Sequence, residues 1–269
     1  MQTTTLRGAY LKPTTTELPI RRLHGITSLV AVVVLSLLIT APVLSQPPAP
    51  PPDYPQSLEK DLKKLLDAKV QDSSDPQALV QMASLYLEMG EELYTEKPQK
   101  LAAFNEGARL AKRALELDEK SAEAHYQYAA GLGSAAEAKG MAASLMALDE
   151  IKTHAKRALE LQKDHVAALH MAGMMLEELP QFMGGNKTAA LDYVKRAVTV
   201  DPNYAHARLD LAKMYMKRKD QESAMRELQT IVTMDHPSDA YAWARRYRPE
   251  AEKLLASLKP AEAAGAAAK

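Results

Sequence analysis

The stretch DPNYAHARLDLAKMYMKRKDQESAMRELQTIVTMDHP, residues Asp201 to Pro237, reads as two helices joined by a short turn. Two partial copies precede it, AKRALELDEKSAEAHYQYA from Ala111 and AKRALELQKDHVAALHMAG from Ala155. A lone helix pair cannot bury its own apolar face, so copies of one pair must stack on one another. The repeat therefore predicts an all-α protein made of stacked helix pairs.

The composition agrees with helices and excludes several function classes. Aromatic residues make up only 5% of the chain and alanine dominates its apolar positions, which suits closely packed helices better than sheets. The whole chain has a formal net charge of zero, and residues 1–45 hold four Lys/Arg and one Asp/Glu, so the remaining residues are slightly acidic. Such a body has no basic surface to bind nucleic acid. The absence of cysteine excludes disulfides, thiolate catalysis and Cys-based zinc sites.

Residues 1–45 read as a targeting segment, with a basic flank before an apolar core from Leu29 to Ile39. This core is shorter than the roughly 20 residues of a membrane-spanning helix and fits the roughly 7–15 residues of a signal peptide. A cleaved signal peptide ending near Ser45 is favoured over an uncleaved signal anchor, and a mitochondrial-type presequence is a third alternative. We therefore expect an exported protein, periplasmic or secreted, alternatively anchored to the membrane by residues 26–44.

The remaining chain divides into three parts. Residues 46–56 are rich in proline, which favours an extended, semi-rigid linker. Residues 57–258 form the predicted helical repeat domain. Residues 259–269 are alanine-rich with nothing large to bury, so we expect a disordered tail.

Small residues mark where the two helices of each pair approach one another. In the last copy, Ala212 lies between Leu211 and Tyr215 on the first helix, and Ala224 precedes Leu228 on the second. The structural repeat positions of all four units are Ala83, Tyr86, Ala114, Ala129, Ala158, Gly173, Ala197, Leu211, Ala212, Tyr215, Ala224 and Leu228. The first three units exceed the last in length, and we expect their extra residues in the turns GEELYTEKPQK, GSAAEAKGMAAS and LPQFMGG.

These positions resemble the tetratricopeptide repeat, with Arg208 at the usual tryptophan place and Ala212 at the usual glycine. The long early inserts, the Gly-Gly-Asn entry at residues 184–186 and the regular last unit are similar to two groups within that family. One is the eukaryotic regulators of microtubule dynamics, and the other is the bacterial periplasmic T-component of TRAP transporters. The resemblance implies a right-handed α-solenoid of about four helix pairs plus a C-terminal capping helix.

The resemblance also implies that the first helix of each unit lines a concave groove. Its positions in this chain are Tyr126, Ala130, His170, Met174, Glu177, Lys213 and Met216. We expect a non-catalytic scaffold that binds a partner protein or peptide in this groove. The alternative is an accessory subunit of a solute transporter, similar to the T-component, with a small apolar ligand held against adaptable methionines; those methionines would otherwise fill gaps in the core.

No catalytic residue, cofactor or nucleic-acid partner is predicted. His125 and His170 are expected near one another in equivalent helices, but no His-x-x-x-His or Glu-x-x-His spacing surrounds them, which favours ordinary, partly buried imidazoles over metal ligands. Residues 184–188, GGNKT, lack the glycine before lysine of a phosphate loop. They are expected to form a turn into a helix that Asn186 caps.

Overall fold

The computed structural model describes residues 53–258, which are helical throughout apart from turns. The elements are α1 (Ser57–Asp67), the 3-10 helix η1 (Val70–Asp72), α2 (Pro76–Glu88), the π-helix η2 (Met89–Leu93), α3 (Lys97–Leu117), α4 (Ala122–Lys139), α5 (Met141–Leu161), α6 (Val166–Glu178), the 3-10 helix η3 (Gln181–Met183), α7 (Lys187–Val200), α8 (Ala205–Lys217), α9 (Gln221–Val232), α10 (Ala240–Ala242), the π-helix η4 (Trp243–Tyr247) and α11 (Arg248–Leu258). The predicted targeting segment, most of the linker and the predicted tail lie outside the described residues.

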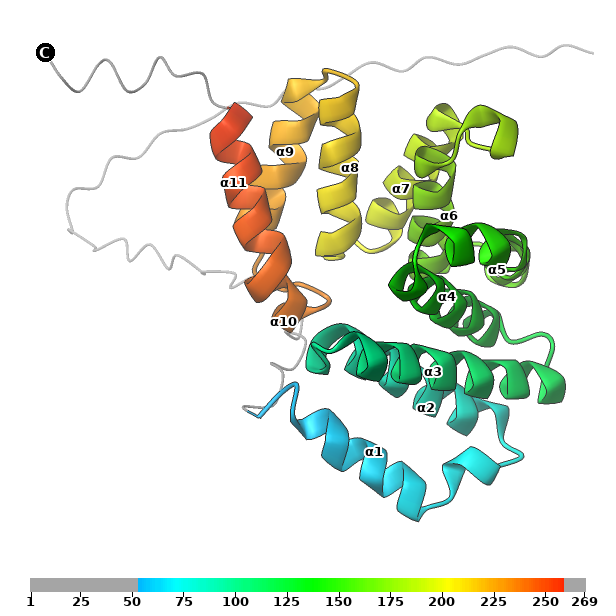
Figure 1. Ribbon diagram of the computed structural model, residues 1–269. Helices are drawn as coiled ribbons and strands as arrows, with labels where there is room; N and C mark the ends of the chain where they lie inside the picture. Colours follow the sequence, from blue (N-terminus) through cyan, green and yellow to red (C-terminus); the bar gives the residue numbers. More distant parts are fainter. Residues whose placement is uncertain (1–52, 259–269) are drawn as a thin grey trace, which may run out of the picture. The chain divides into compact units, whose positions relative to one another are not determined.

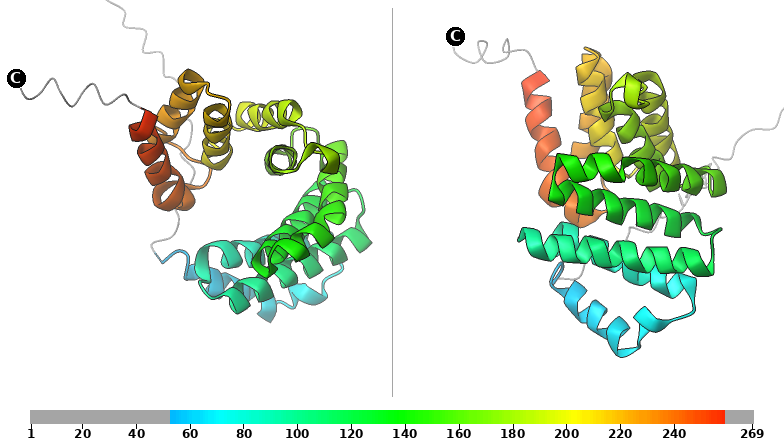
Figure 2. Two further views of the ribbon diagram at one scale, coloured as in Figure 1. Left: turned by 45° about the horizontal axis from the view of Figure 1, so that its top comes forward. Right: turned by 45° about the vertical axis from the view of Figure 1, so that its right-hand side comes forward.

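Four antiparallel pairs follow one another along a curved path: α2/α3, α4/α5, α6/α7 and α8/α9 (Figures 1 and 2). We call these pairs units 1 to 4. Helix α1 precedes the first unit, and α11 packs against α9 after the last. The predicted solenoid of four helix pairs with a C-terminal capping helix is therefore confirmed.

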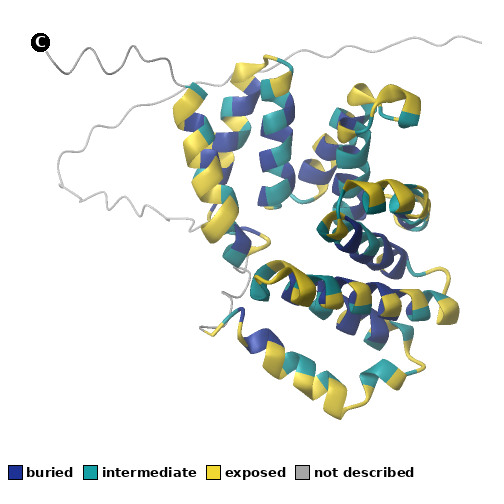
Figure 3. Cartoon of the chain, in the orientation of Figure 1, coloured by how far each residue is buried: buried dark blue, intermediate teal, exposed yellow. Residues whose placement is uncertain are grey.

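The core lies between successive helices, where each pair covers the apolar face of the next (Figure 3). One buried cluster joins α2, α3 and α4, a second joins α6, α7 and α8, and a third joins α8, α9 and α11. Their members include Leu79, Ala111 and Ala124; Leu169, Val194 and Leu211; and Ala212, Leu228 and Leu255. Helix α8 contributes to two clusters, so it is covered by neighbours on both sides.

The predicted repeat positions form this core. Ten of the twelve are buried, while Tyr86 and Tyr215 are partly buried and pack against the clusters. Gly173 shows why a small residue is needed at a helix crossing, because a Cβ atom there would lie 2.5 Å from Cγ2 of Val194. The positions of the small residues in the sequence thus mark where paired helices lie closest together.

The extra residues of the early units are accommodated in three different ways. In unit 3 they form the predicted loop, where a Cβ atom on Gly185 would lie only 1.9 Å from the carbonyl oxygen of Leu179. The backbone N–H of Ala189 donates to Asn186 Oδ1 at 3.0 Å, which confirms the predicted cap of α7. In unit 1 they form η2 and lengthen α3.

The predicted turn over residues 133–144 in unit 2 is wrong. These residues are helical except at Gly140, so both helices are simply longer than in the last unit. Gly140 has φ of +119°, a conformation that residues with a Cβ atom rarely adopt, and it reverses the chain within one residue.

The second helix of the stretch Asp201 to Pro237 is shorter than that stretch suggests, since α9 ends at Val232 and not near His236. The backbone N–H of Ser238 donates to the carbonyl oxygen of Asn203 at 3.0 Å, so the chain must leave the helix earlier to reach the turn before α8. In the capping element, Pro249 lies in the first turn of α11, where proline is tolerated. Trp243 Nε1 donates to the carbonyl oxygen of Ile231 at 2.8 Å.

Candidate functional site

The charged residues predicted to line the groove are already paired between neighbouring elements. The carboxylate of Glu177, on α6, accepts from the guanidinium of Arg218 just after α8 at 2.8 and 3.3 Å, and Glu177 is only 2% exposed. The ammonium of Lys213 lies 2.9 Å from a carboxylate oxygen of Glu250 and 3.7 Å from one of Asp210. These ion pairs join α6 to α8 and α8 to α11.

The apolar groove positions are partly buried rather than fully exposed. Met174 packs against the cluster of α6, α7 and α8, as expected of a methionine that fills a gap in the core. Ala130 and Met216 have intermediate burial. The ring of Tyr126 lies 5.0 Å, centroid to centroid, from the ring of His165.

His170 belongs to a group that sequence reasoning missed. It contains His170, Tyr204, His206, Asp210 and Tyr247, which we call the inner cluster. His170 Nε2 lies 2.9 Å and His206 Nε2 lies 3.5 Å from Oδ2 of Asp210. The only signal in the sequence was the spacing of His206 and Asp210, four residues apart on one helix face.

Burial and neighbouring charges set the protonation of the inner cluster. His206 is only partly buried, but its packing against neighbouring rings removes enough hydration to lower its pKa below the ordinary value, and the nearby His170 lowers it further. Burial alone would raise the pKa of Asp210, but the hydrogen bond from His170 and the nearby cations hold it below its ordinary value. At neutral pH His206 is therefore a neutral imidazole and Asp210 a carboxylate.

A second candidate surface lies between α5, α6 and α7, which we call the α5–α7 cleft. Its open cavity has a volume of about 660 Å³. Partly exposed apolar side chains line it, including Leu159, Met175, Leu176, Leu179 and Tyr193. Four basic side chains, Lys152, Lys156, Lys163 and Arg196, and one acidic one, Glu160, also line it. Sequence reasoning missed this cleft because it considered only the first helix of each unit.

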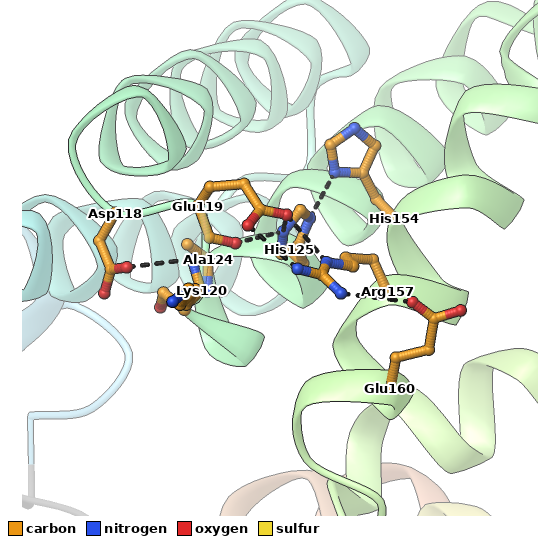
Figure 4. Close-up of polar contacts among 9 residues, drawn as sticks. Asp118, Glu119, Lys120, Ala124, His125, His154, Arg157 and Glu160 are labelled. Atoms are coloured by element: carbon orange, nitrogen blue, oxygen red, sulfur yellow. Dashed lines mark hydrogen bonds and ion pairs between the residues drawn. The ribbon is translucent and has the colours of Figure 1, made fainter.

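His125 and His170 contact different sets of side chains, so the structure does not bring these two histidines into one site. His125 Nδ1 lies 2.8 Å from His154 Nδ1, and its Nε2 lies 2.9 Å from the carbonyl oxygen of Glu119 (Figure 4). The guanidinium of Arg157 binds the Glu119 carboxylate through two nitrogens at 2.8 and 3.0 Å. This network joins the turn before α4 to α5.

We expect acidification to destabilise the protein through His154. Its pKa is lowered, first by burial and then by His125 and Lys112, against the opposing effect of Glu150. Because the folded state holds the proton less tightly than the unfolded chain, this group costs no stability above its ordinary pKa near 6.5 and destabilises the fold as pH falls below it. Urea unfolding at pH 7.5 and 5.5 measures the loss. The control is His154→Asn, which should lose less stability than the parent over this interval; an equal loss would contradict the assignment.

Within residues 53–258, no helix combines the length and the apolar character needed to cross a membrane. One cluster of three potential metal-ligating side chains lies in this described range, formed by His170, His206 and Asp210.

Two protein-family models together match most of the described residues. The family model described as regulator of microtubule dynamics protein 1-3 matches residues 54–176, and a tetratricopeptide-repeat model matches residues 184–246. Regulator of microtubule dynamics protein 1 of Bos taurus is 29% identical over 169 residues, which cover 57% of this chain and 53% of that protein. The Pongo abelii protein is 28% identical over 203 residues, which cover 70% and 64%. The chain thus spans between about half and two thirds of these relatives.

A solved structure shows the same fold. A thermophilic tetratricopeptide-repeat protein from Thermus thermophilus superposes with a TM-score of 0.54 over 74% of this chain and 92% of that chain. Its sequence is only 14% identical, so the likeness concerns the fold alone.

Proposed function

Because this chain is a tetratricopeptide-repeat protein that resembles regulator of microtubule dynamics protein 1, we propose that it is a non-catalytic scaffold that binds a segment of a partner protein. A solenoid of this kind offers extended surfaces between its units and generally carries no catalytic machinery. The observation that carries the proposal is the α5–α7 cleft, where apolar side chains remain accessible between two units.

The cleft fits an amphipathic helix of the partner. Residues of α5, α6 and α7 all line it, so it is a groove between helices rather than a closed pocket. An amphipathic helix binds such a groove by placing apolar side chains, three and four residues apart, against its apolar lining. Leu176 and Met175 offer this helix partly exposed apolar contacts.

The rim of the cleft selects for acidic residues. Lys163 is exposed, and so is Lys156, at 80%, although its ammonium lies 3.5 Å from a carboxylate oxygen of Glu160. Arg196 pairs with Asp164 through bonds of 2.7 and 3.1 Å. Glu160 offsets only part of this positive charge. We therefore propose that the bound segment carries Asp or Glu on its polar flanks, which would steer its association and fix its register.

Photo-cross-linking in the cells that make the protein tests this proposal. A photoreactive amino acid replaces Lys163 at the rim of the cleft in the full chain, and the matched control position is Lys63, an exposed lysine of α1. We expect a discrete protein adduct only from the cleft position. The additional substitution Lys156→Glu should weaken binding by roughly tenfold and reduce the adduct accordingly.

The outcome also separates the cleft from the predicted concave groove. A photoreactive residue at Met216 that gives the adduct, while Lys163 gives none, would contradict binding in the cleft. The cross-linked segment of the partner must be acidic with apolar residues at helical spacing. Equal adducts from Lys63 and Lys163 would indicate contact without a specific site.

We also propose that the scaffold is exported, as a periplasmic or secreted protein or one anchored by residues 26–44. The support is the basic flank followed by a short apolar core in residues 1–45. The proline-rich residues 46–56 would then separate the repeat body from the membrane or from the cleavage site.

The second candidate function is an accessory subunit of a transporter that holds a small apolar ligand. Its support is the size of the cavity in the α5–α7 cleft, which lies in the range of small-molecule pockets. Native mass spectrometry of the purified protein distinguishes the two functions. A retained small molecule that is released on unfolding would favour the carrier.

A further inference from the structure

The inner cluster brings together donor atoms of three side chains from two units. His170 comes from α6, and His206 and Asp210 come from α8, where a spacing of four residues places them on one face. Each of the three side chains has one donor atom that lies within 4.8 Å of a donor atom of both others. The fold, rather than a local motif, therefore creates this site.

The donor distances are compatible with a single small metal ion. A tetrahedral zinc ion with bonds of about 2.0–2.1 Å requires neighbouring donor atoms about 3.4 Å apart. Oδ2 of Asp210 lies 2.9 Å from His170 Nε2 and 3.5 Å from His206 Nε2. Small movements of the three side chains would replace the present hydrogen bonds by bonds to an ion.

Neighbouring side chains hold the donor groups in place. The Tyr204 hydroxyl lies 3.4 Å from His170 Nδ1, which leaves Nε2 directed at Asp210. The ring of Tyr247 stacks on His206 with centroids 4.9 Å apart and an interplanar angle of 14°. Such outer contacts fix the orientation of imidazole ligands at metal sites.

Burial is graded across the site in a way that suits a metal centre. The side chains of His170 and Asp210 are 8% and 13% exposed, whereas His206 is 43% exposed. An ion can therefore enter past His206 and keep a fourth position for water. Three protein ligands with one open position are typical of zinc sites that are not purely structural.

We propose that His170, His206 and Asp210 form a binding site for a divalent transition-metal ion of the zinc class. Two imidazole nitrogens and one carboxylate oxygen favour zinc, copper or nickel over magnesium and calcium, which prefer oxygen ligands. A bound ion would join unit 3 to unit 4 beside η4, so the site would also stabilise the C-terminal half of the solenoid.

Lys213 gives the proposal a distinctive electrostatic test. Its ammonium lies 3.7 Å from Oδ1 of Asp210 and is held by Glu250 at 2.9 Å. A cation at this distance opposes a metal ion on the same carboxylate. Removal of this charge by Lys213→Met should therefore raise zinc affinity, whereas a purely structural role of Asp210 predicts no such rise.

Calorimetric titration of the chelator-treated full chain with zinc chloride tests the site. We expect one zinc ion per chain, and visible absorption typical of tetrahedral coordination when cobalt(II) is used instead. His206→Asn and Asp210→Asn should each lower zinc affinity by at least tenfold. The His206→Asn variant should keep the helical content of the parent without zinc, so that a loss of zinc binding does not reflect a loss of folding.

The matched control is His154→Asn, which removes one imidazole of the other histidine pair. It should leave zinc affinity unchanged. Three results would overturn the proposal: no zinc binding by the parent, binding that survives His206→Asn but is lost in His154→Asn, or an affinity that does not rise in Lys213→Met.

Discussion

Replacement of Arg218 by alanine should lower the free energy of unfolding by about 3–5 kcal/mol, the usual cost of leaving a buried charge without its partner. Glu177 is 2% exposed, and two guanidinium nitrogens of Arg218 hold its carboxylate. The nearest other cation is Lys217, with its ammonium 4.0 Å away and 57% of its side chain exposed. Lys217 can compensate only in part, because its charge is solvated.

Arg218 also connects two backbone segments. Its guanidinium donates to the carbonyl oxygen of Lys187 at 2.7 Å and to that of Met214 at 2.9 Å. The first bond joins the start of α7 to the end of α8, so alanine at this position weakens the junction between units 3 and 4. This loss adds to the cost of the unpaired carboxylate.

Urea unfolding of three variants separates these contributions. The matched control Lys217→Ala removes a neighbouring exposed cation and should change stability by less than about 1 kcal/mol. The double variant Glu177→Leu/Arg218→Leu removes both charges and should recover much of the loss, because an apolar pair can replace a buried ion pair. If Arg218→Ala costs no more than Lys217→Ala, the buried pair does not stabilise the junction.

The fold could be predicted because the repeat encodes where helices touch. Ala212, Ala197 and Gly173 recur at buried positions in successive units, and a Cβ atom at Gly173 would lie only 2.5 Å from Cγ2 of Val194. Burial of these positions follows from the pattern and needs no knowledge of the rest of the chain. Helix ends depend on single residues instead, so Gly140 ended α4 where a longer loop was expected.

The candidate sites were harder to predict because they depend on the geometry between units. His170 was named from its position on α6, but its partners His206 and Asp210 come from the next unit, and Tyr247 comes from η4. Which side chains meet across units depends on how far each helix pair is rotated relative to the previous one. The periodic sequence pattern does not specify this rotation. The α5–α7 cleft has the same origin, since its walls belong to different units.

The substitution Ala212→Glu should cost about 3 kcal/mol or more, because it places a charge in an apolar contact between helices. Ala212 is fully buried in the cluster that joins α8, α9 and α11, together with Leu228 and Leu255. A glutamate side chain there must either displace these leucines or lose its hydration. The matched control is Ala102→Glu, the same change at an exposed alanine of α3, which should stay within about 0.5 kcal/mol.

The fluorescence of Trp243, the chain's single tryptophan, reports on this cluster directly. Its indole donates to the carbonyl oxygen of Ile231, and its ring packs against the cluster that contains Ala212. The midpoint of the unfolding transition followed by its fluorescence should therefore move to a lower urea concentration in Ala212→Glu. In a solenoid each unit is stabilised mainly by its neighbours, so the loss should appear first at this C-terminal junction, before the helical signal of units 1 and 2 is lost. A variant in which Trp243 unfolds as in the parent would contradict the position of Ala212 at a tight helix crossing.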